Sequence, residues 1–130
     1  MQCSECRSDT VSFAVPAELS EYAPGGGSAA AICTSCLNVQ PAESVEGDGD
    51  LTRVSEAFAV DEASAVEMAL VVGLLSSLAL NRSKIETLLE RIEDRGTDPM
   101  LVLEELEGDG GLKPSVAIGR RRNQLEQLMG

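Results

Sequence analysis

The pattern of apolar and polar residues changes its period along the chain, from that of a strand near the N-terminus to that of a helix beyond it. Apolar residues alternate with small or polar ones over 10–15, which predicts a β-strand that ends at Pro16. The glycine-rich segment 20–28 predicts a flexible loop without packing capacity, and 29–32 predicts a second strand. Together these segments predict a short β-hairpin.

The helical period begins after an acidic segment, 41–55, which lacks apolar periodicity and is interpreted as a linker. The long apolar run over 61–80 predicts a helix that is apolar on most sides and therefore central. A second helix is expected to begin beside Ser83, which fits an S-x-x-E capping box with Glu86, and to end at Gly96.

Two shorter helices follow. Asp98 followed by Pro99 matches an N-cap and a first helical residue, and Gly108 ends the helix that they begin. The Lys-Pro pair at 113–114 predicts the start of a last helix. Residues 56–130 are therefore predicted to form a small α-helical bundle.

Four cysteines in two C-x-x-C pairs are the strongest chemical signal in the chain: Cys3 with Cys6, and Cys33 with Cys36. Each pair is expected on a tight turn that points both sulfurs the same way, so that the two pairs offer four thiolates to one tetrahedral Zn²⁺. Residues 1–40 hold too few apolar side chains to fold on a core of their own. We therefore predict an α+β protein in which a zinc ribbon over 1–40, with one structural Zn²⁺ per chain, precedes the helical bundle.

Other interpretations of the cysteines remain open. A rubredoxin-like iron site has similar spacing, and the sequence barely separates iron from zinc. A redox dithiol needs a C-x-x-C between a strand and a helix, and Cys3 stands too near the start of the sequence for that. Four ordinary buried cysteines fit poorly with matched pairs in polar turns. Ribbon turns commonly carry C-P-x-C-G, whereas Arg7 and Leu37 follow the pairs here and neither pair has the proline.

The charge balance narrows the range of partners. The 130 residues include 22 acidic and 10 basic ones, with a formal net charge of −12. This balance disfavours general binding to nucleic acid or to anionic membranes, which needs a cationic surface. An acidic composition with only two lysines, Lys84 and Lys113, is typical of halophilic proteins, although an ordinary acidic protein can share it.

Localisation is expected to be cytoplasmic. The N-terminus has no basic region followed by an apolar run, as a signal peptide would require, and a cysteine already stands at position 3. The most apolar stretch, 65–80, is short for a membrane span and suits a buried helix. Thiols in the cytoplasm stay reduced, which favours metal ligation over disulfides.

Catalytic signals are weak. The chain has no histidine, which excludes histidine-dependent nucleophilic and metal sites, and it has no phosphate-binding glycine motif. The basic cluster Arg120, Arg121 and Arg122 is a possible contact to a partner. We favour ion pairs with the acidic helices instead, because three consecutive helical residues point to three sides. The chain is therefore not expected to be an enzyme.

Six stretches of sequence carry a resemblance to a known group of proteins. They are Met1-Gln-Cys-Ser-Glu-Cys, Val11-Ser-Phe-Ala-Val-Pro16, Ile32-Cys-Thr-Ser-Cys36, Leu74-Leu-Ser-Ser-Leu-Ala-Leu80, Val102-Leu-Glu-Glu-Leu106 and Arg121-Arg-Asn-Gln-Leu-Glu-Gln-Leu128. With these stretches the chain resembles a family of small haloarchaeal zinc-ribbon proteins of unknown function. The resemblance supports the four cysteines as ligands and implies no activity.

These observations predict a non-enzymatic zinc-binding protein with a structural Cys₄ site. We expect it to act as an adaptor that contacts another protein, by analogy with other zinc ribbons. Nucleic acid is a less favoured partner because of the net charge, and no membrane contact is expected. The alternative from another class is a thiol-based redox or metal sensor whose ribbon opens on oxidation.

Overall fold

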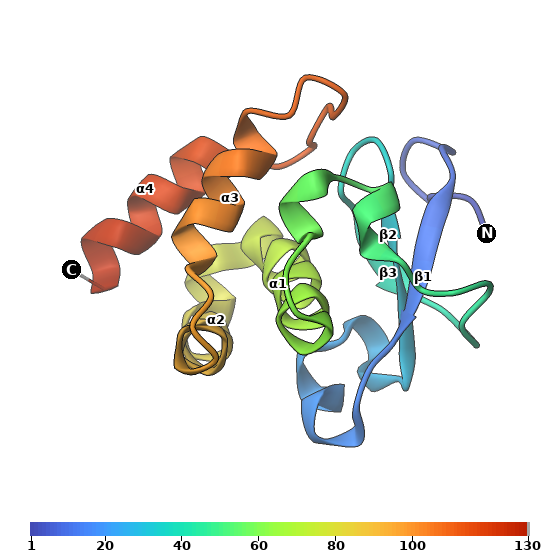
Figure 1. Ribbon diagram of the computed structural model, residues 1–130, viewed down its shortest axis with the longest axis horizontal. Coiled ribbons are helices and arrows are strands. Elements are labelled where there is room, and N and C mark those ends of the chain that lie inside the picture. The colour runs from blue at the N-terminus through green and yellow to red at the C-terminus, as the bar shows by residue number, and fades with distance from the viewer. Residues whose placement is uncertain (130) are drawn as a thin grey trace.

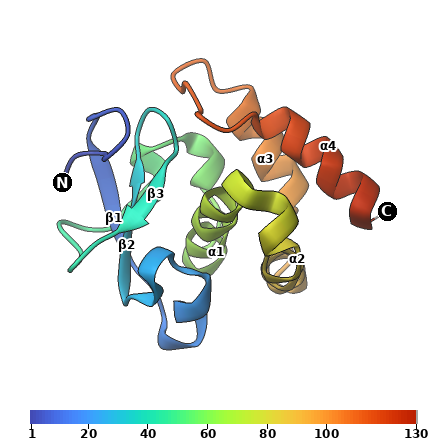
Figure 2. The same ribbon diagram turned by 180° about the vertical axis from the view of Figure 1, so that it is seen from behind.

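A computed structural model describes residues 1–129, and residue 130, the end of the predicted helical domain, lies outside the described residues. The elements are strands β1 (Thr10–Ala14), β2 (Ala29–Cys33) and β3 (Val39–Pro41), and helices α1 (Glu62–Leu74), α2 (Leu78–Asp94), α3 (Pro99–Glu107) and α4 (Ile118–Met129). The strands form an antiparallel sheet at the N-terminal end, so the α+β class is confirmed. In both ribbon views α1 lies next to the sheet, and the other helices lie beyond it (Figures 1 and 2).

The sheet follows the order β1-β2-β3, so β2 is its central strand. Val11 of β1 lies opposite Ile32 of β2, which in turn lies opposite Val39 of β3. Every residue of β2 is buried, as expected for a strand covered on both faces. The third strand was not predicted, because three residues ending in Pro41 are too few to show a period.

Helix α1 is the buried centre of the fold, as predicted, but it ends earlier than expected. It stops at Leu74, a 3₁₀ turn covers Leu75–Ser77, and α2 begins at Leu78. Within the turn Ser76 donates its hydroxyl to the Gly73 carbonyl, a local bond that competes with the helical ladder. The apolar period therefore continues through a bend that the pattern alone does not reveal.

The predicted capping box is wrong. Ser83 lies inside α2, where its carbonyl accepts a hydrogen bond from the Thr87 hydroxyl. The helix begins five residues earlier, at Leu78, because Ser76 and Ser77 of the preceding turn already interrupt the apolar run. Asn81 donates its side-chain amide to the Leu74 carbonyl, which satisfies an acceptor freed at the end of α1.

The predicted boundaries around α3 are confirmed by local hydrogen bonds. Gly96 adopts a φ of 89°, and the amides of Gly96 and Thr97 bond to the carbonyls of Glu93 and Ile92, the pattern of a Schellman motif. The Asp98 carboxylate accepts from two amides in the first turn of α3, and Gly108 caps its end.

The last helix does not begin at the Lys-Pro pair as predicted. Helix α4 starts at Ile118, and 113–117 form a loop instead. The physical reason is non-local: the amides of Lys113 and Ser115 donate to the carbonyls of Ser35 and Cys36, far away in sequence. These bonds use the amides in an extended connection rather than in a first helical turn.

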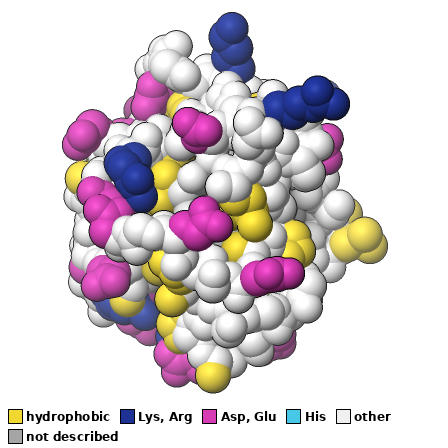
Figure 3. Space-filling model, turned by 90° about the vertical axis from the view of Figure 1, so that its right-hand side faces the viewer, with side chains coloured by type: hydrophobic (Ala, Val, Ile, Leu, Met, Phe, Trp, Pro, Cys, Tyr) yellow, Lys and Arg dark blue, Asp and Glu magenta, His cyan; other side chains and the backbone are white. Residues whose placement is uncertain are grey.

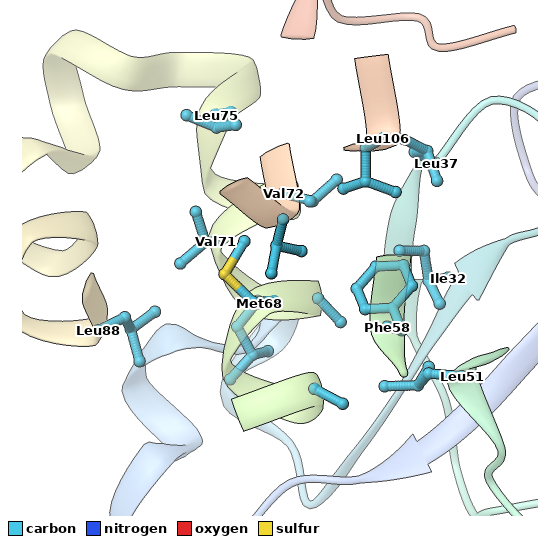
Figure 4. Close-up of a cluster of buried hydrophobic side chains, with 14 of the residues drawn as sticks. Ile32, Leu37, Leu51, Phe58, Met68, Val71, Val72, Leu75, Leu88 and Leu106 are labelled. Carbon is cyan, nitrogen blue, oxygen red and sulfur yellow. The ribbon is translucent and has the colours of Figure 1, made fainter. Parts of the chain in front are cut away.

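The hydrophobic core is one cluster that joins the N-terminal segment to the helices. It includes Ile32 of β2, Met68 of α1, Leu106 of α3 and Phe58 from the turn between the sheet and α1. Figure 4 shows side chains from these elements converging on the space between the sheet and α1. The division into a ribbon over 1–40, a linker over 41–55 and a helical domain over 56–130 stays a prediction about folding units. In space the three segments share this core.

Two segments expected to lack packing contribute to it. The predicted loop 20–28 begins inside a 3₁₀ helix, Ala17–Tyr22, that buries Leu19, and Ala23 within the loop is itself buried. The acidic segment 41–55 buries Leu51 and Val54. Isolated apolar residues in such stretches have no periodic neighbours, so sequence patterns overlook them.

The run Glu62–Asp94 is long and apolar enough to cross a membrane by length and composition alone. In this fold 56% of its most apolar window is buried inside the protein, which fits the core helix that was predicted. Figure 3 shows the face of the molecule that carries β1, with acidic side chains spread over it and hydrophobic surface between them.

Candidate metal centre

The first C-x-x-C pair lies in a tight turn between Gln2 and Asp9, which form an isolated antiparallel bridge. Within the turn the Cys3 amide donates to the Ser8 carbonyl, and the Arg7 amide donates to the Cys3 carbonyl. These bonds reverse the chain in a few residues and place both thiols of the pair on one side.

The second pair repeats this geometry at the end of β2. The Cys33 amide donates to the Asn38 carbonyl, five residues ahead, just as the Cys3 amide bonds five residues ahead in the first turn. The two turns meet because β1 and β2 are adjacent, and the Thr34 amide and hydroxyl both donate to the Asp9 carbonyl. The hairpin register thus brings together turns that are far apart in sequence.

All four thiol sulfurs meet at one point of the fold. The Sγ atoms of Cys3, Cys6, Cys33 and Cys36 lie within 4.8 Å of one another, with 3.7 Å between Cys3 and Cys36 and 3.4 Å between Cys6 and Cys33. A tetrahedral Zn²⁺ with Zn–S bonds of about 2.3 Å requires sulfurs about 3.8 Å apart. The four cysteines therefore fit a metal ion, although this geometry does not separate zinc from iron.

Backbone amides surround the sulfurs and favour their charged form. The Glu5 amide donates to Cys3 Sγ at 3.3 Å, and the amides of Ser35 and Cys36 donate to Cys33 Sγ at 3.3 and 3.4 Å. Such hydrogen bonds stabilise thiolates and orient them as ligands. Cys3, Cys33 and Cys36 are buried, whereas Cys6 is exposed.

The thiols differ in acidity in the metal-free protein. Hydrogen bonding from Ser8 lowers the pKa of Cys6 to about 6. Burial raises the pKa of Cys36 to about 12, and burial also raises the pKa of Cys33. Burial acts on Cys3 in the same sense, but the amides around it outweigh burial and lower its pKa. The first turn is thus the more acidic of the two.

Arg7 and Leu37 occupy the position after each pair, where ribbons commonly carry glycine. Both adopt a φ of 65°, in the left-handed region that is costly for residues with a side chain. A residue with a side chain at each of these two positions therefore adds backbone strain to the turn. Leu37 offsets its strain by burying its side chain in the core, whereas Arg7 is exposed.

We expect Arg7→Gly to stabilise the protein by about 1 kcal/mol, because glycine adopts this φ without strain. Leu37→Gly relieves the same strain but removes a buried side chain, so we expect a net loss of about 2 kcal/mol or more. Urea unfolding of the two variants beside the parent protein measures both. Destabilisation by Arg7→Gly would show that the turn is not strained there.

The second turn is held from the other end of the chain. The Lys113 amide donates to the Ser35 carbonyl at 2.8 Å, and the Ser115 amide donates to the Cys36 carbonyl at 3.1 Å. The loop 113–117 leads directly into α4, so the position of this helix is linked to the second cysteine turn. Sequence reasoning missed this contact because no local pattern records a pairing across the whole chain.

The basic cluster does not join the cysteines in one site. It lies near the start of α4, where Arg122 pairs with Glu126 and Glu107 at 3.1 and 3.7 Å. Arg121 donates to the Gln124 side chain. Within residues 1–129 no carboxylate lies within ion-pair distance of Arg120 or Arg121.

A polar cluster around a buried glutamate escaped the sequence analysis. Glu67 of α1 is fully buried, and its carboxylate accepts from Arg91 Nε at 2.5 Å and from Arg95 Nη2 at 3.0 Å. This carboxylate raises the pKa of both guanidinium groups. The available signal was one glutamate inside an apolar run and two arginines four residues apart on the next helix. The cluster joins α1 to α2.

Comparison with known proteins gives one match. Residues 2–129 match the model of a family described as a family of unknown function (DUF6276). No curated protein and no solved structure matches the chain at a significant level. The match spans both the cysteine turns and the helices.

Proposed function

Because the chain belongs to this family of unknown function (DUF6276), whose description carries no activity, we propose a function from its own residues. The protein binds one Zn²⁺ through Cys3, Cys6, Cys33 and Cys36 as a structural ion, and acts as a non-enzymatic adaptor for a protein partner. The observation that carries the proposal is the convergence of four thiols at tetrahedral spacing. Four cysteine ligands fill a tetrahedral ion, which leaves no position for a catalytic water.

The surroundings of the site support a structural role. The two turns tie the N-terminus, the end of β2 and the loop 113–117 together, and three of the four cysteines are buried. A metal ion at this point would fix three chain segments at once. Free energy of metal binding is then also free energy of folding.

Hydrogen exchange of the metal-bound and chelated protein tests this role. We expect the amides of Cys3, Cys33, Lys113 and Ser115 to lose protection when zinc is removed, while amides inside α2 keep theirs. A protection pattern unchanged by the chelator, with zinc loss verified by metal analysis, would contradict a structural ion.

Zinc binding near neutral pH is expected to release protons, chiefly from Cys33 and Cys36, because burial raises the pKa values of these two thiols. Zinc affinity should therefore fall as the pH falls, because protons compete with the ion for the thiolates. Calorimetry of zinc binding in buffers of different ionisation enthalpy counts the released protons. Binding without proton release would mean that all four thiolates exist before the metal arrives.

One observation favours the alternative function of a redox or metal sensor. Cys6 is exposed and its pKa is lowered to about 6, so its thiolate is open to oxidants when no metal is bound. Its Sγ lies 3.4 Å from that of Cys33, within reach of a disulfide after a small movement.

Mild peroxide separates the two functions. Peroxide would convert the Cys6 thiolate to a sulfenic acid with release of hydroxide, and attack by the Cys33 thiol would form the disulfide with loss of water. A structural site should keep its zinc under conditions that oxidise a free thiol. Stoichiometric zinc release and a Cys6–Cys33 disulfide, reversible by thiol reductants, would favour the sensor.

A further inference from the structure

A groove runs between the start of α2 and the exposed side of α4. It has a volume of about 260 Å³ and is lined by Leu78, Ala79, Arg121, Gln124, Gln127 and Leu128. We call it the α2–α4 groove. None of these side chains belongs to the cysteine site or to the buried Glu67 cluster, so the proposed structural metal does not account for it.

Exposed leucines accompany the groove. Leu128 in its wall is 43% exposed, and Leu80, the residue after Ala79, is 88% exposed. The leucines of α2 that face the core, Leu88 and Leu89, are fully buried. Leu80 and Leu128 are therefore not part of the hydrophobic core. Apolar side chains left on the surface beside a hollow are a common mark of a docking site.

The charge at the groove is positive, opposite in sign to the net charge of the protein. Within residues 1–129, Arg120 and Arg121 lie beyond ion-pair distance of every carboxylate, while neighbouring Arg122 has two. This is unusual in a chain with 22 acidic and 10 basic residues. Arg121 lines the groove and Arg120 precedes it on α4. An acidic ligand would therefore meet one guanidinium group in the groove and a second one residue away, neither of them neutralised by a carboxylate of residues 1–129.

We propose that the α2–α4 groove docks an acidic amphipathic segment of a partner protein. Apolar side chains of the segment contact Ala79 and Leu128 above the buried Leu78. Its carboxylates pair with Arg121, which lines the groove, and with Arg120, the preceding residue of α4. This inference rests on the proposed adaptor role and gives it a surface and a chemical class of partner.

The two other macromolecules that could cover the groove fit less well. A nucleic acid would meet the electrostatic repulsion of a chain with a net charge of −12, and the groove has no aromatic side chain for a base to stack on. A second copy would offer an α4 that carries three arginines and one glutamate, Glu126, which already pairs with Arg122, so it supplies few free carboxylates for Arg120 and Arg121. An acidic peptide satisfies both the apolar lining and the charge.

The test is a titration of the zinc-loaded protein with a short synthetic helical peptide that carries leucine on one face and glutamate on the other. A matched peptide with lysine in place of every glutamate is the control. We expect changes in amide chemical shift for the acidic peptide alone, concentrated at 78–80 and 120–128. The double variant Arg120→Glu/Arg121→Glu should weaken binding about tenfold or more.

The control variant Arg53→Glu/Lys84→Glu makes the same change in net charge at basic residues outside the groove. Equal weakening by both double variants would overturn the proposal, since it would reveal attraction by net charge alone. Binding of both peptides, or shifts elsewhere on the surface, would also overturn it. So would self-association of the free protein that Arg120→Glu/Arg121→Glu abolishes, because the occupant would then be a second copy. Zinc content is measured in every sample, so failure of docking with zinc retained leaves the metal site standing.

Discussion

Cys33→Ser is expected to abolish stoichiometric metal binding and to unfold the cysteine turns. Cys33 is fully buried at the end of the central strand, and its Sγ accepts hydrogen bonds from two amides. Structural zinc in finger peptides contributes ~10–16 kcal/mol at neutral pH. Losing even a quarter of that would remove much of the ~5–15 kcal/mol by which domains of this size are stable. We expect a fall of more than 10 °C in the thermal midpoint, on the order of what ~3 kcal/mol produces.

Two variants make this expectation specific. Cys6→Ser removes a ligand from the exposed side of the site, so water can take its place, and we expect weakened rather than abolished binding. Ser35→Ala lies in the same turn as Cys33, but it keeps the backbone amide that bonds to the sulfur and should leave metal content unchanged. Calorimetry and metal analysis of the three proteins measure the effects. Full zinc content in Cys33→Ser would exclude this thiol as a ligand.

Glu67→Ala is expected to destabilise the protein by about 3 kcal/mol, because it removes the hydrogen bonds by which the buried carboxylate holds the partly exposed Arg91 and Arg95 against α1. The two guanidinium groups lie four residues apart on α2 and repel each other once the carboxylate is gone. Chemical denaturation measures the free energy of unfolding. The exposed pair Arg82–Glu86 provides a matched control.

Glu86→Ala should cost less than about 0.5 kcal/mol, because an exposed i,i+4 pair contributes little. A second comparison replaces all three members of the buried cluster with leucine. That triple variant should be more stable than Glu67→Ala, since leucine at 67 fills the space that alanine leaves empty. If Glu67→Ala and Glu86→Ala cost the same, the Glu67 cluster has no special role in joining α1 to α2.

The features that could be predicted from the sequence are those that depend on residues close together in the chain. The cysteine pairs, the turn at Gly96 and the cap at Asp98 each depend on residues within a few positions of one another, and the structure has all three. The class of fold followed from the change of hydrophobic period, because burial on one side of a strand or helix imposes that period.

Features that depend on distant partners were missed. The amides of Lys113 and Ser115 donate to a turn almost eighty residues earlier, and Glu67 meets arginines 24 and 28 residues later. The interruption between α1 and α2 at Leu75–Ser77 was not predicted, because the apolar residues on both sides of it keep the helical period. A single sequence carries no mark of such pairings. They appear only when the fold brings the segments together.

The helices and the cysteine turns are linked through the loop 113–117, which gives the metal centre a consequence beyond the N-terminal segment. The loop bonds to the second cysteine turn and continues into α4, the helix that carries Arg120 and Arg121. A metal ion at the turn would therefore help to fix the position of the α2–α4 groove. The proposed docking surface and the proposed structural ion are thus connected through the loop 113–117.

Metal analysis of the protein, purified without chelator and with its thiols kept reduced, tests the central claim most directly. The account predicts close to one equivalent of zinc per chain, lost together with any single buried cysteine ligand. Less than about half an equivalent of any metal, in a protein that is nevertheless folded, would contradict the claim that the four cysteines form a metal centre.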